Sequence, residues 1–79
     1  MALYEAYEGK VVLADAESLN ALRKEFVRLN ETWAMCCPNI TCIRVHIDEE
    51  TYDLPKQLVS DFINDLCNET DFLPCVEEL

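Results

Sequence analysis

The strongest structural pattern in the sequence lies between residues 15 and 34. Apolar side chains recur there at spacings of three and four, which places them on one side of an α-helix. This apolar stripe consists of Leu19, Leu22, Phe26, Leu29 and Trp33. Asp15 or Ser18 can cap the start of the helix, because a short side-chain oxygen accepts a hydrogen bond from a free backbone N–H group there. The helix has to bury its apolar side, so the rest of the chain must supply a partner surface, with Trp33 as one core anchor.

Two segments have the patterns of β-strands. Residues 3–14 place two β-prone runs on either side of Glu8-Gly9, and this glycine is the only one in the chain. That arrangement predicts a hairpin, in which Val11 and Leu13 face one side and Val12 and Ala14 face the other. Residues 41–48 alternate between apolar and polar side chains, which predicts a half-buried strand. Its apolar side would carry Ile43, Val45 and Ile47, and its polar side Cys42, Arg44, His46 and Asp48.

Residues 54–68 predict a second helix. Asp53 can cap it, and Pro55 suits its first turn. Its expected inner stripe, with Val59 and Ile63 beside it, is Leu54, Leu58, Phe62 and Leu66. The elements follow one another in the order β-hairpin–α–β–α. We therefore expect an α+β fold, with a three-stranded sheet and two helices on one face of it.

Length and composition limit the number and size of the domains. Residues 1–79 are enough for one small domain near the lower size limit for an independent hydrophobic core, and about half of them are apolar. The sheet face opposite the helices is covered by fewer residues of this chain, and it carries Arg44 and His46 together with Tyr4 or Tyr7. We expect that face to leave room for a partner or for a second copy of the chain.

Charge is divided unevenly along the sequence. Residues 1–47 contain six acids against five bases, a net charge of −1, whereas residues 48–79 contain ten acids against Lys56 alone, a net charge of −9. Nearly all of the total of −10 therefore lies in the acidic C-terminal half. Direct binding to nucleic acid or to an anionic membrane needs positive charge, so the sequence argues against both.

The five cysteines and the single histidine are the candidates for metal binding and for nucleophilic catalysis. No C-x-x-C spacing occurs among the five cysteines, and Cys42 and His46 lie about 13 Å apart along one strand, too far for one tetrahedral zinc ion. The acidic run at residues 47–53 lacks the glycine and the alternating ligands of an EF-hand loop. A cysteine with His46 is the only nucleophile–base pair available, and His46 lies in the middle of a strand. We expect no metal, no cofactor, no catalytic residues and no enzyme activity.

Residues 1–10 contain Glu5 and Glu8 and have no basic region before an apolar core, so they are unlike a signal peptide. We therefore expect a cytoplasmic protein, in the cytoplasm of the host cell if it is viral, with all five thiols free. Three Asn-x-Thr triplets, at Asn30, Asn39 and Asn68, match the short N-glycosylation pattern and carry little weight without a secretion signal.

The acids of the second half are the candidate binding residues. Asp61 and Asp65 are four apart on one side of the predicted helix, and Glu69 continues their line. Like charges at this spacing destabilise a helix slightly, and acids near its C-terminus do so too. Such a placement favours a role in meeting a basic partner. The expected partner-binding residues are Asp48, Glu49, Glu50, Asp53, Asp61, Asp65 and Glu69.

In size, charge and compactness the chain is similar to the small acidic inhibitors that phages make against host nucleic-acid enzymes, such as anti-CRISPR and anti-restriction proteins. The expectation is therefore a protein-binding inhibitor that blocks the basic nucleic-acid-binding surface of a larger protein. The alternative is a small structural or adaptor subunit, or an antitoxin-type or immunity-type protein, as a monomer or a homodimer.

Overall fold

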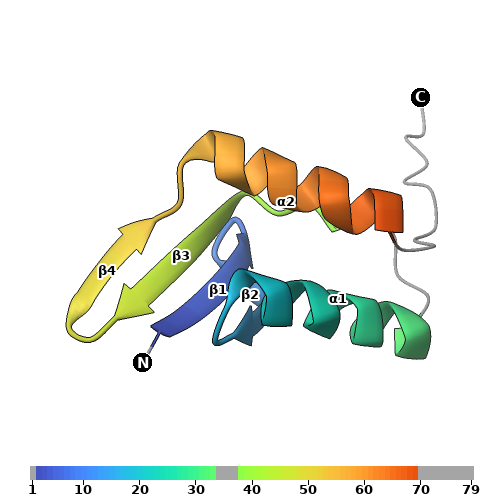
Figure 1. Cartoon of the computed structure of the whole chain (residues 1–79), viewed down its shortest axis with the longest axis horizontal. Helices are drawn as coiled ribbons and strands as arrows, with labels where there is room; N and C mark the ends of the chain where they lie inside the picture. The colour runs from blue at the N-terminus through green and yellow to red at the C-terminus, as the bar shows by residue number, and fades with distance from the viewer. Residues whose placement is uncertain (1, 34–37, 70–79) are drawn as a thin grey trace.

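The computed structural model describes residues 2–33 and 38–69, apart from the side chain of Trp33, whose predicted place in the core lies outside the described residues. The described chain forms strands and helices in the order β1 (Ala2–Glu8), β2 (Val11–Ala16), α1 (Leu19–Trp33), β3 (Cys42–Ile47), β4 (Glu50–Asp53) and α2 (Lys56–Glu69) (Figure 1). A hairpin followed by a helix thus occurs twice. We call residues 2–33 the first ββα unit and residues 38–69 the second ββα unit.

The strands form one antiparallel sheet in the order β2-β1-β3-β4. The α+β class with two helices is confirmed, but the expected three-stranded sheet is wrong because β4 adds a fourth strand. All four residues of β4 are exposed, so burial imposed no apolar alternation that sequence reasoning could detect. Pairing with β3 supplies its backbone hydrogen bonds, and Thr51 and Tyr52 have β-prone side chains.

Both hairpins close with two-residue turns that require a left-handed backbone. Gly9 has φ 62°, and Asp48 has φ 55°. Glycine adopts this conformation without steric cost, and aspartate tolerates it better than most residues. The first turn comprises residues 9 and 10, one residue later than the predicted Glu8-Gly9. Thr41 supports it from the other unit, because its hydroxyl accepts a hydrogen bond from the Gly9 amide at 2.8 Å.

A bulge in the first hairpin changes which side chains face the core. Ala6 pairs with Ala14, but the next residue, Tyr7, pairs with Val12, so Leu13 is an extra residue on β2. Extra residues of this kind interrupt the alternation of a strand. Leu13 and Ala14 consequently both contact the core, while Val12 is 41% exposed. The predicted grouping of Val12 with Ala14 on one side is therefore wrong, because Ala14 is buried in the core and Val12 lies on the same face as Tyr7.

The two helices begin differently. Ser18 caps α1, where its hydroxyl accepts a hydrogen bond from the Ala21 amide at 3.0 Å and its carbonyl accepts one from Leu22 at 2.8 Å. In α2 the Pro55 carbonyl accepts the first bonds, from Leu58 and Val59. The predicted cap at Asp53 is wrong, because Asp53 ends β4 and its carboxylate is bound by Arg44 instead.

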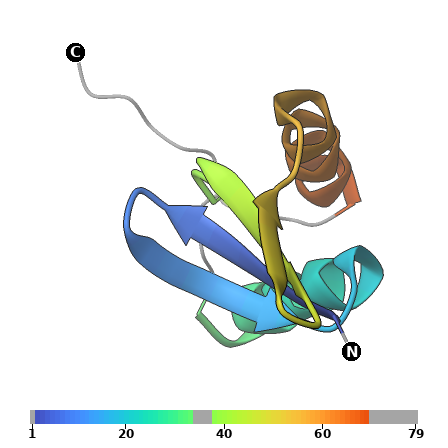
Figure 2. The same cartoon turned by 90° about the vertical axis from the view of Figure 1, so that its left-hand side faces the viewer.

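Both helices pack on the same face of the sheet (Figure 2). Phe26 of α1 and Phe62 of α2 meet edge to face, with ring centroids 6.2 Å apart and an interplanar angle of 65°. The buried core around them, which includes the predicted residues Leu22, Val45 and Leu66, consists of Ala6, Ala14, Leu22, Phe26, Ile40, Ile43, Val45, Val59, Phe62 and Leu66. The helix faces were therefore predicted correctly at these positions.

One residue of the predicted inner stripe of α2 lies outside the core. Leu58 is 46% exposed, whereas its neighbour Val59 is buried. Consecutive helical positions differ by about 100°, so the side of α2 that is centred on Val59, Phe62 and Leu66 leaves Leu58 at its margin. This apolar side chain at the surface becomes part of a groove described below.

Candidate functional site

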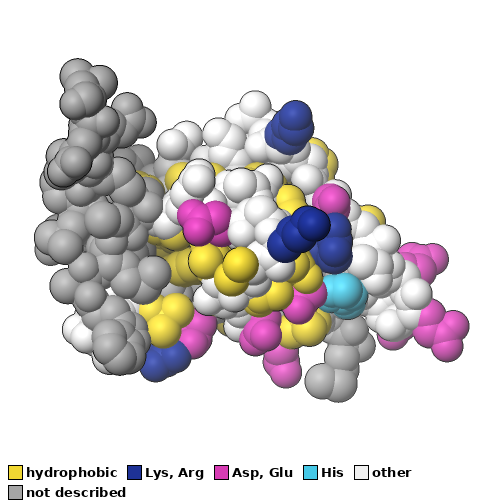
Figure 3. All heavy atoms as spheres, turned by 180° about the vertical axis from the view of Figure 1, so that it is seen from behind, with side chains coloured by type: hydrophobic (Ala, Val, Ile, Leu, Met, Phe, Trp, Pro, Cys, Tyr) yellow, Lys and Arg dark blue, Asp and Glu magenta, His cyan; other side chains and the backbone are white. Residues whose placement is uncertain are grey.

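The seven predicted binding acids do not form one surface. Asp48, Glu49 and Glu50 lie at the turn between β3 and β4 and at the start of β4, while Asp61, Asp65 and Glu69 lie on α2. Figure 3 shows acidic side chains projecting from the end of the molecule that carries the β3–β4 turn, at the right of that view. Asp53 is apart from both groups, at the end of β4.

Asp53 and Glu69 are engaged in ion pairs. Asp53 accepts a hydrogen bond from Arg44 at 3.0 Å, and Glu69 lies 2.9 Å from a guanidinium nitrogen of Arg23 on α1. The carboxylates of both pairs are about half exposed, at 52% and 56%. Exposed pairs of this kind contribute at most about 1 kcal/mol each, because water and salt screen them. The predicted row of three charges on α2 is thus reduced to Asp61 and Asp65.

Asp61 and Asp65 border a groove between the two helices. This interhelical groove has a volume of about 280 Å³ and is lined by Leu19, Asn20, Arg23, Leu58, Asp61, Phe62 and Asp65. Gln57 donates a hydrogen bond to Asp61 at 3.0 Å, one turn earlier on α2. Among the ion pairs of residues 2–33 and 38–69, none includes Asp61 or Asp65.

The wall of the interhelical groove opposite these acids belongs to α1. Arg23 there is bound on two sides, by Glu69 and by the Asn20 side-chain oxygen at 2.7 Å. Its positive charge is therefore already matched by Glu69. The groove consequently combines an apolar surface from Leu19, Leu58 and Phe62 with the negative charge of Asp61 and Asp65.

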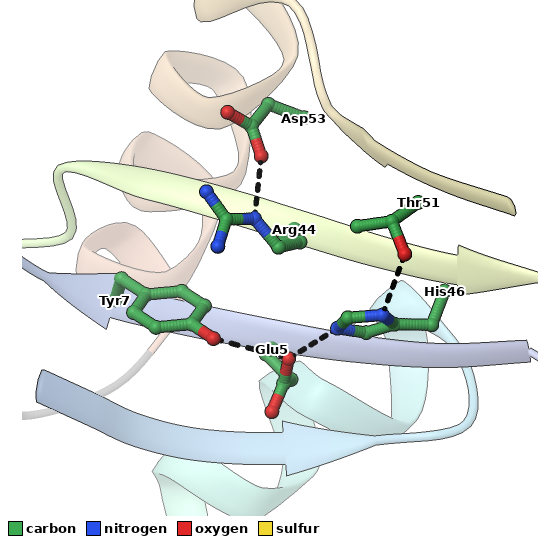
Figure 4. A network of polar contacts seen from close by, with 6 residues as sticks. All are labelled: Glu5, Tyr7, Arg44, His46, Thr51 and Asp53. Carbon is green, nitrogen blue, oxygen red and sulfur yellow. Dashed lines mark hydrogen bonds and ion pairs between the residues drawn. The ribbon is translucent and has the colours of Figure 1, made fainter. Parts of the chain in front are cut away.

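A second cluster of polar side chains covers the sheet face that points away from the helices (Figure 4). We call it the open-face network. Its members lie on three strands: Glu5 and Tyr7 on β1, Arg44 and His46 on β3, and Thr51 and Asp53 on β4. Figure 3 also shows this side of the molecule, where the single histidine lies among basic, acidic and hydrophobic side chains.

Glu5 is the centre of the open-face network. It accepts a hydrogen bond from the Tyr7 hydroxyl at 3.2 Å and contacts Nε2 of His46. The other ring nitrogen, Nδ1, lies 3.0 Å from the Thr51 hydroxyl. Desolvation, followed by the hydrogen bond to Glu5 and its negative charge, raises the pKa of Tyr7. The tyrosine therefore stays neutral and continues to donate its proton to Glu5.

Arg44 joins the two halves of this network. Its guanidinium lies 5.2 Å from the centroid of the Tyr7 ring, a cation–π distance, and its Nε donates to Asp53. The hydrogen bond to Asp53 is the main cause that raises the pKa of Arg44 further. Arg44 is thus paired with Asp53 and lies against Tyr7, and the open-face network links β1, β3 and β4.

Thr51, His46 and Glu5 have the order of a hydroxyl, an imidazole and a carboxylate, as in hydrolase triads. Catalysis also needs donors for a developing oxyanion and a cleft that holds the substrate. The interhelical groove and a smaller one of about 220 Å³, beside Ile40 and Val59, are both lined by other residues. The arrangement accounts for strand cohesion, and the absence of enzyme activity stays a prediction.

Sequence reasoning missed Glu5 and Thr51 and left Tyr7 as an alternative to Tyr4 on this face, because the register of three strands brings the members of the network together. Glu5 pairs with Arg44 across β1 and β3, and His46 pairs with Thr51 across β3 and β4. One signal was available. Each of the three strands places two polar side chains two positions apart, and this spacing puts both on the same face.

The thiols differ from the prediction. Cys42 is free, but Cys67 is disulfide-bonded, so the expectation that every thiol is free is wrong. Disulfides persist in oxidising compartments and are rare in a reducing cytosol, so the thiols do not support a reducing compartment. Within residues 2–33 and 38–69, no three His, Cys, Asp or Glu side chains are grouped to hold a metal ion.

Among the described helices, neither is long and apolar enough to cross a membrane. Comparison of the chain with known protein families, with curated proteins and with solved structures found no match.

Proposed function

We propose that this chain is a small acidic inhibitor that binds the basic nucleic-acid-binding surface of a larger protein, in the manner of phage proteins that act against host defence complexes such as CRISPR or restriction systems. The observation that carries this proposal is the exposed negative charge of the second ββα unit. Its seven acids face two bases, a net charge of −5, whereas the first ββα unit has six acids against four bases, a net charge of −2.

The placement of these acids adds support. No basic residue occurs in the last turn of α2, where a positive side chain would favour the helix dipole, and the like charges Asp61 and Asp65 are i, i+4 neighbours. Both features work slightly against helix stability. Residues with that effect at exposed positions are better explained by an interaction with a cationic partner than by the needs of the fold.

The spacing of the acids suits such a partner. Four residues of α-helix rise about 6 Å, which is on the scale of the ~3.4 Å step between phosphates along one nucleic-acid strand. Lysine and arginine side chains that normally contact phosphates could therefore reach Asp61 and Asp65. The acids at the β3–β4 turn extend the negative field away from α2 and would speed the encounter.

The test is titration of the chain against a partner that is captured from the native host, in competition with that partner's DNA or RNA. Changing Asp61→Lys and Asp65→Lys together should weaken binding at least tenfold, which is about 1.4 kcal/mol. Both residues are exposed, so the fold should persist. Binding should also weaken as salt rises from about 50 to about 300 mM, because exposed charges are screened.

A matched control keeps the charge change but moves it to the first ββα unit. Glu8→Lys with Glu31→Lys alters two exposed acids there and changes the net charge by the same amount. We expect this control to bind within a fewfold of the parent. Equal losses of affinity in both double variants would mean that binding depends only on net charge and not on the position of the acids. If neither variant loses affinity and nucleic acid does not compete, the inhibitor proposal is refuted.

A second candidate is the adaptor subunit, assembled as a homodimer. The supporting observation is the exposed apolar surface of Leu3 and Val12, at 37% and 41%, on the sheet face that no helix of the described chain covers. Sedimentation at rising protein concentration tests it. A dimer that Val12→Asp dissociates would favour this candidate, and a monomer at every concentration would exclude it.

A further inference from the structure

The interhelical groove has the features of a site for one anchoring side chain. Leu58 is one of the exposed large hydrophobic residues, although it lies on a helix whose neighbouring apolar residues are buried. Leu19 is partly exposed beside it in the same groove, and the buried ring of Phe62 also lines that groove. Apolar side chains that together line a concave surface are typical of binding sites, because a partner that covers them removes their apolar area from water. A single exposed apolar side chain on a convex surface is common in proteins and indicates no site.

The size of the groove limits what it can hold. Its volume of about 280 Å³ lies just below the usual range for small-molecule sites, which is about 300 to 1,000 Å³. A groove of this size, open along the two helices, suits one or two side chains of a larger partner. Protein interfaces are commonly organised around such anchors, which are surrounded by polar contacts that exclude water.

The charge at the rim of the groove indicates which chemical class of partner can bind there. Asp61 and Asp65 contribute two negative charges on the α2 side, and Arg23 on the α1 side is already neutralised by Glu69. An anionic ligand would meet repulsion there, and a neutral one would leave both carboxylates without a counter-charge. The complementary partner presents lysine or arginine on either side of an apolar side chain.

An α-helix offers this arrangement with little ordering cost. Side chains four apart on a helix are separated by about 6 Å along the axis, the same rise that separates Asp61 from Asp65. We propose that the interhelical groove binds a basic amphipathic helix of the partner, whose apolar side chain contacts Leu58 and Phe62 while its flanking lysines or arginines pair with Asp61 and Asp65. The inference rests on the proposed function and names the part of the partner that the acidic unit contacts.

The probe for this proposal is a synthetic peptide of about 18 residues, rich in alanine and long enough to form a helix alone. It carries one leucine at position i, flanked by lysines at i−1 and i+3, which are four residues apart like Asp61 and Asp65. It is titrated into the isotope-labelled full chain, and amide shifts are followed by NMR. We expect the shifts to be concentrated in residues 19–23 and 58–65. Replacing the probe leucine with alanine, or both flanking lysines with glutamine, should each weaken binding about tenfold.

Matched changes in the protein separate the groove from the rest of the surface. Leu58→Ala should weaken probe binding severalfold, whereas Val12→Ala, at a similarly exposed apolar residue on the open face, should not. If the alanine probe binds as tightly as the parent probe, the groove proposal fails, while a dependence on lysine would still leave the acidic inhibitor standing. If the lysine-free probe binds unchanged, the basic partner is excluded and the proposed function loses its chemical basis. Absence of binding, or shifts confined to another face, also overturns the groove.

Discussion

The two ββα units have the same order of elements but different surfaces. Each has a hairpin with a two-residue turn and a helix that places a phenylalanine in the shared core. On α1 charges of both signs are mixed, and Glu25 pairs locally with Arg28. On α2 the only base is Lys56, and the acids that follow it have no basic neighbour within the helix. The same fold therefore tolerates either surface, so the acidity of the second unit is not required for folding.

The largest effect expected from this comparison concerns the shared core. Phe26→Ala and Phe62→Ala should each lower the free energy of unfolding by about 3 to 5 kcal/mol, because each leaves a cavity at the contact between the helices. Phe26 is completely buried and Phe62 is 7% exposed, so the change in the first unit should cost more. Chemical denaturation measures both. A loss below about 1 kcal/mol in either variant would mean that its helix face is assigned wrongly.

The stability of the protein should depend on the disulfide bond of Cys67. A reductant is expected to lower the melting temperature of the parent, because a native disulfide typically contributes about 2 to 4 kcal/mol. The same reductant should act on Cys42→Ser, where the disulfide remains, and not on Cys67→Ser, where it is absent. Equal sensitivity of all three proteins to the reductant would contradict this assignment of Cys67.

The two hairpin turns should respond differently to substitution. Gly9→Ala should cost about 1 kcal/mol, because alanine is strained at φ 62° even though no atom lies within 4 Å of the added methyl group. Asp48→Gly should change stability by less, since aspartate already tolerates φ 55° and glycine relieves only a part of that strain. The free energies of unfolding from urea titration test this order, and a neutral Gly9→Ala would reverse it.

The smallest expected effect is electrostatic and concerns α1. The hydrogen bond from Arg28 lowers the pKa of Glu25 below its ordinary value of 4.5. A lowered carboxyl pKa contributes stability above the unfolded-state value, and that contribution disappears as the pH falls through the lowered pKa. Glu25→Gln should therefore lower the melting temperature slightly at neutral pH and not at all in strong acid. A difference that persists in acid would point to a packing effect.

The helices could be predicted well, because a stripe with a period of 3.6 residues is a strong signal when one side of a helix is buried. Residues 15–34 and 54–68 became Leu19–Trp33 and Lys56–Glu69. The same logic failed for β4, whose exposed residues carry no such periodicity. It failed again at Leu58, because a spacing of four from Phe62 fits the inner stripe but does not fix where the stripe ends.

The candidate sites were predictable only in part. The exposure of Asp61 and Asp65 follows from the helix period, but the ion pairs of Asp53 and Glu69 depend on strand register and on how the two helices lie together. The interhelical groove depends on the same packing, since its lining comes from residues some forty positions apart. No local pattern of residues specifies contacts of that range.

The outer strands of the described sheet are β2 and β4. Among residues 2–33 and 38–69, no strand pairs with the outer edge of β2 or of β4, and such edges can template the addition of strands from other molecules. The bulge at Leu13 distorts the first edge, while the second is only four residues long and is bounded by Glu50 and Asp53. Repulsion between copies of the chain weakens as its net charge falls, and the isoelectric point of the sequence is about 4.2. Self-association of the folded chain through β4 should therefore be strongest in mild acid.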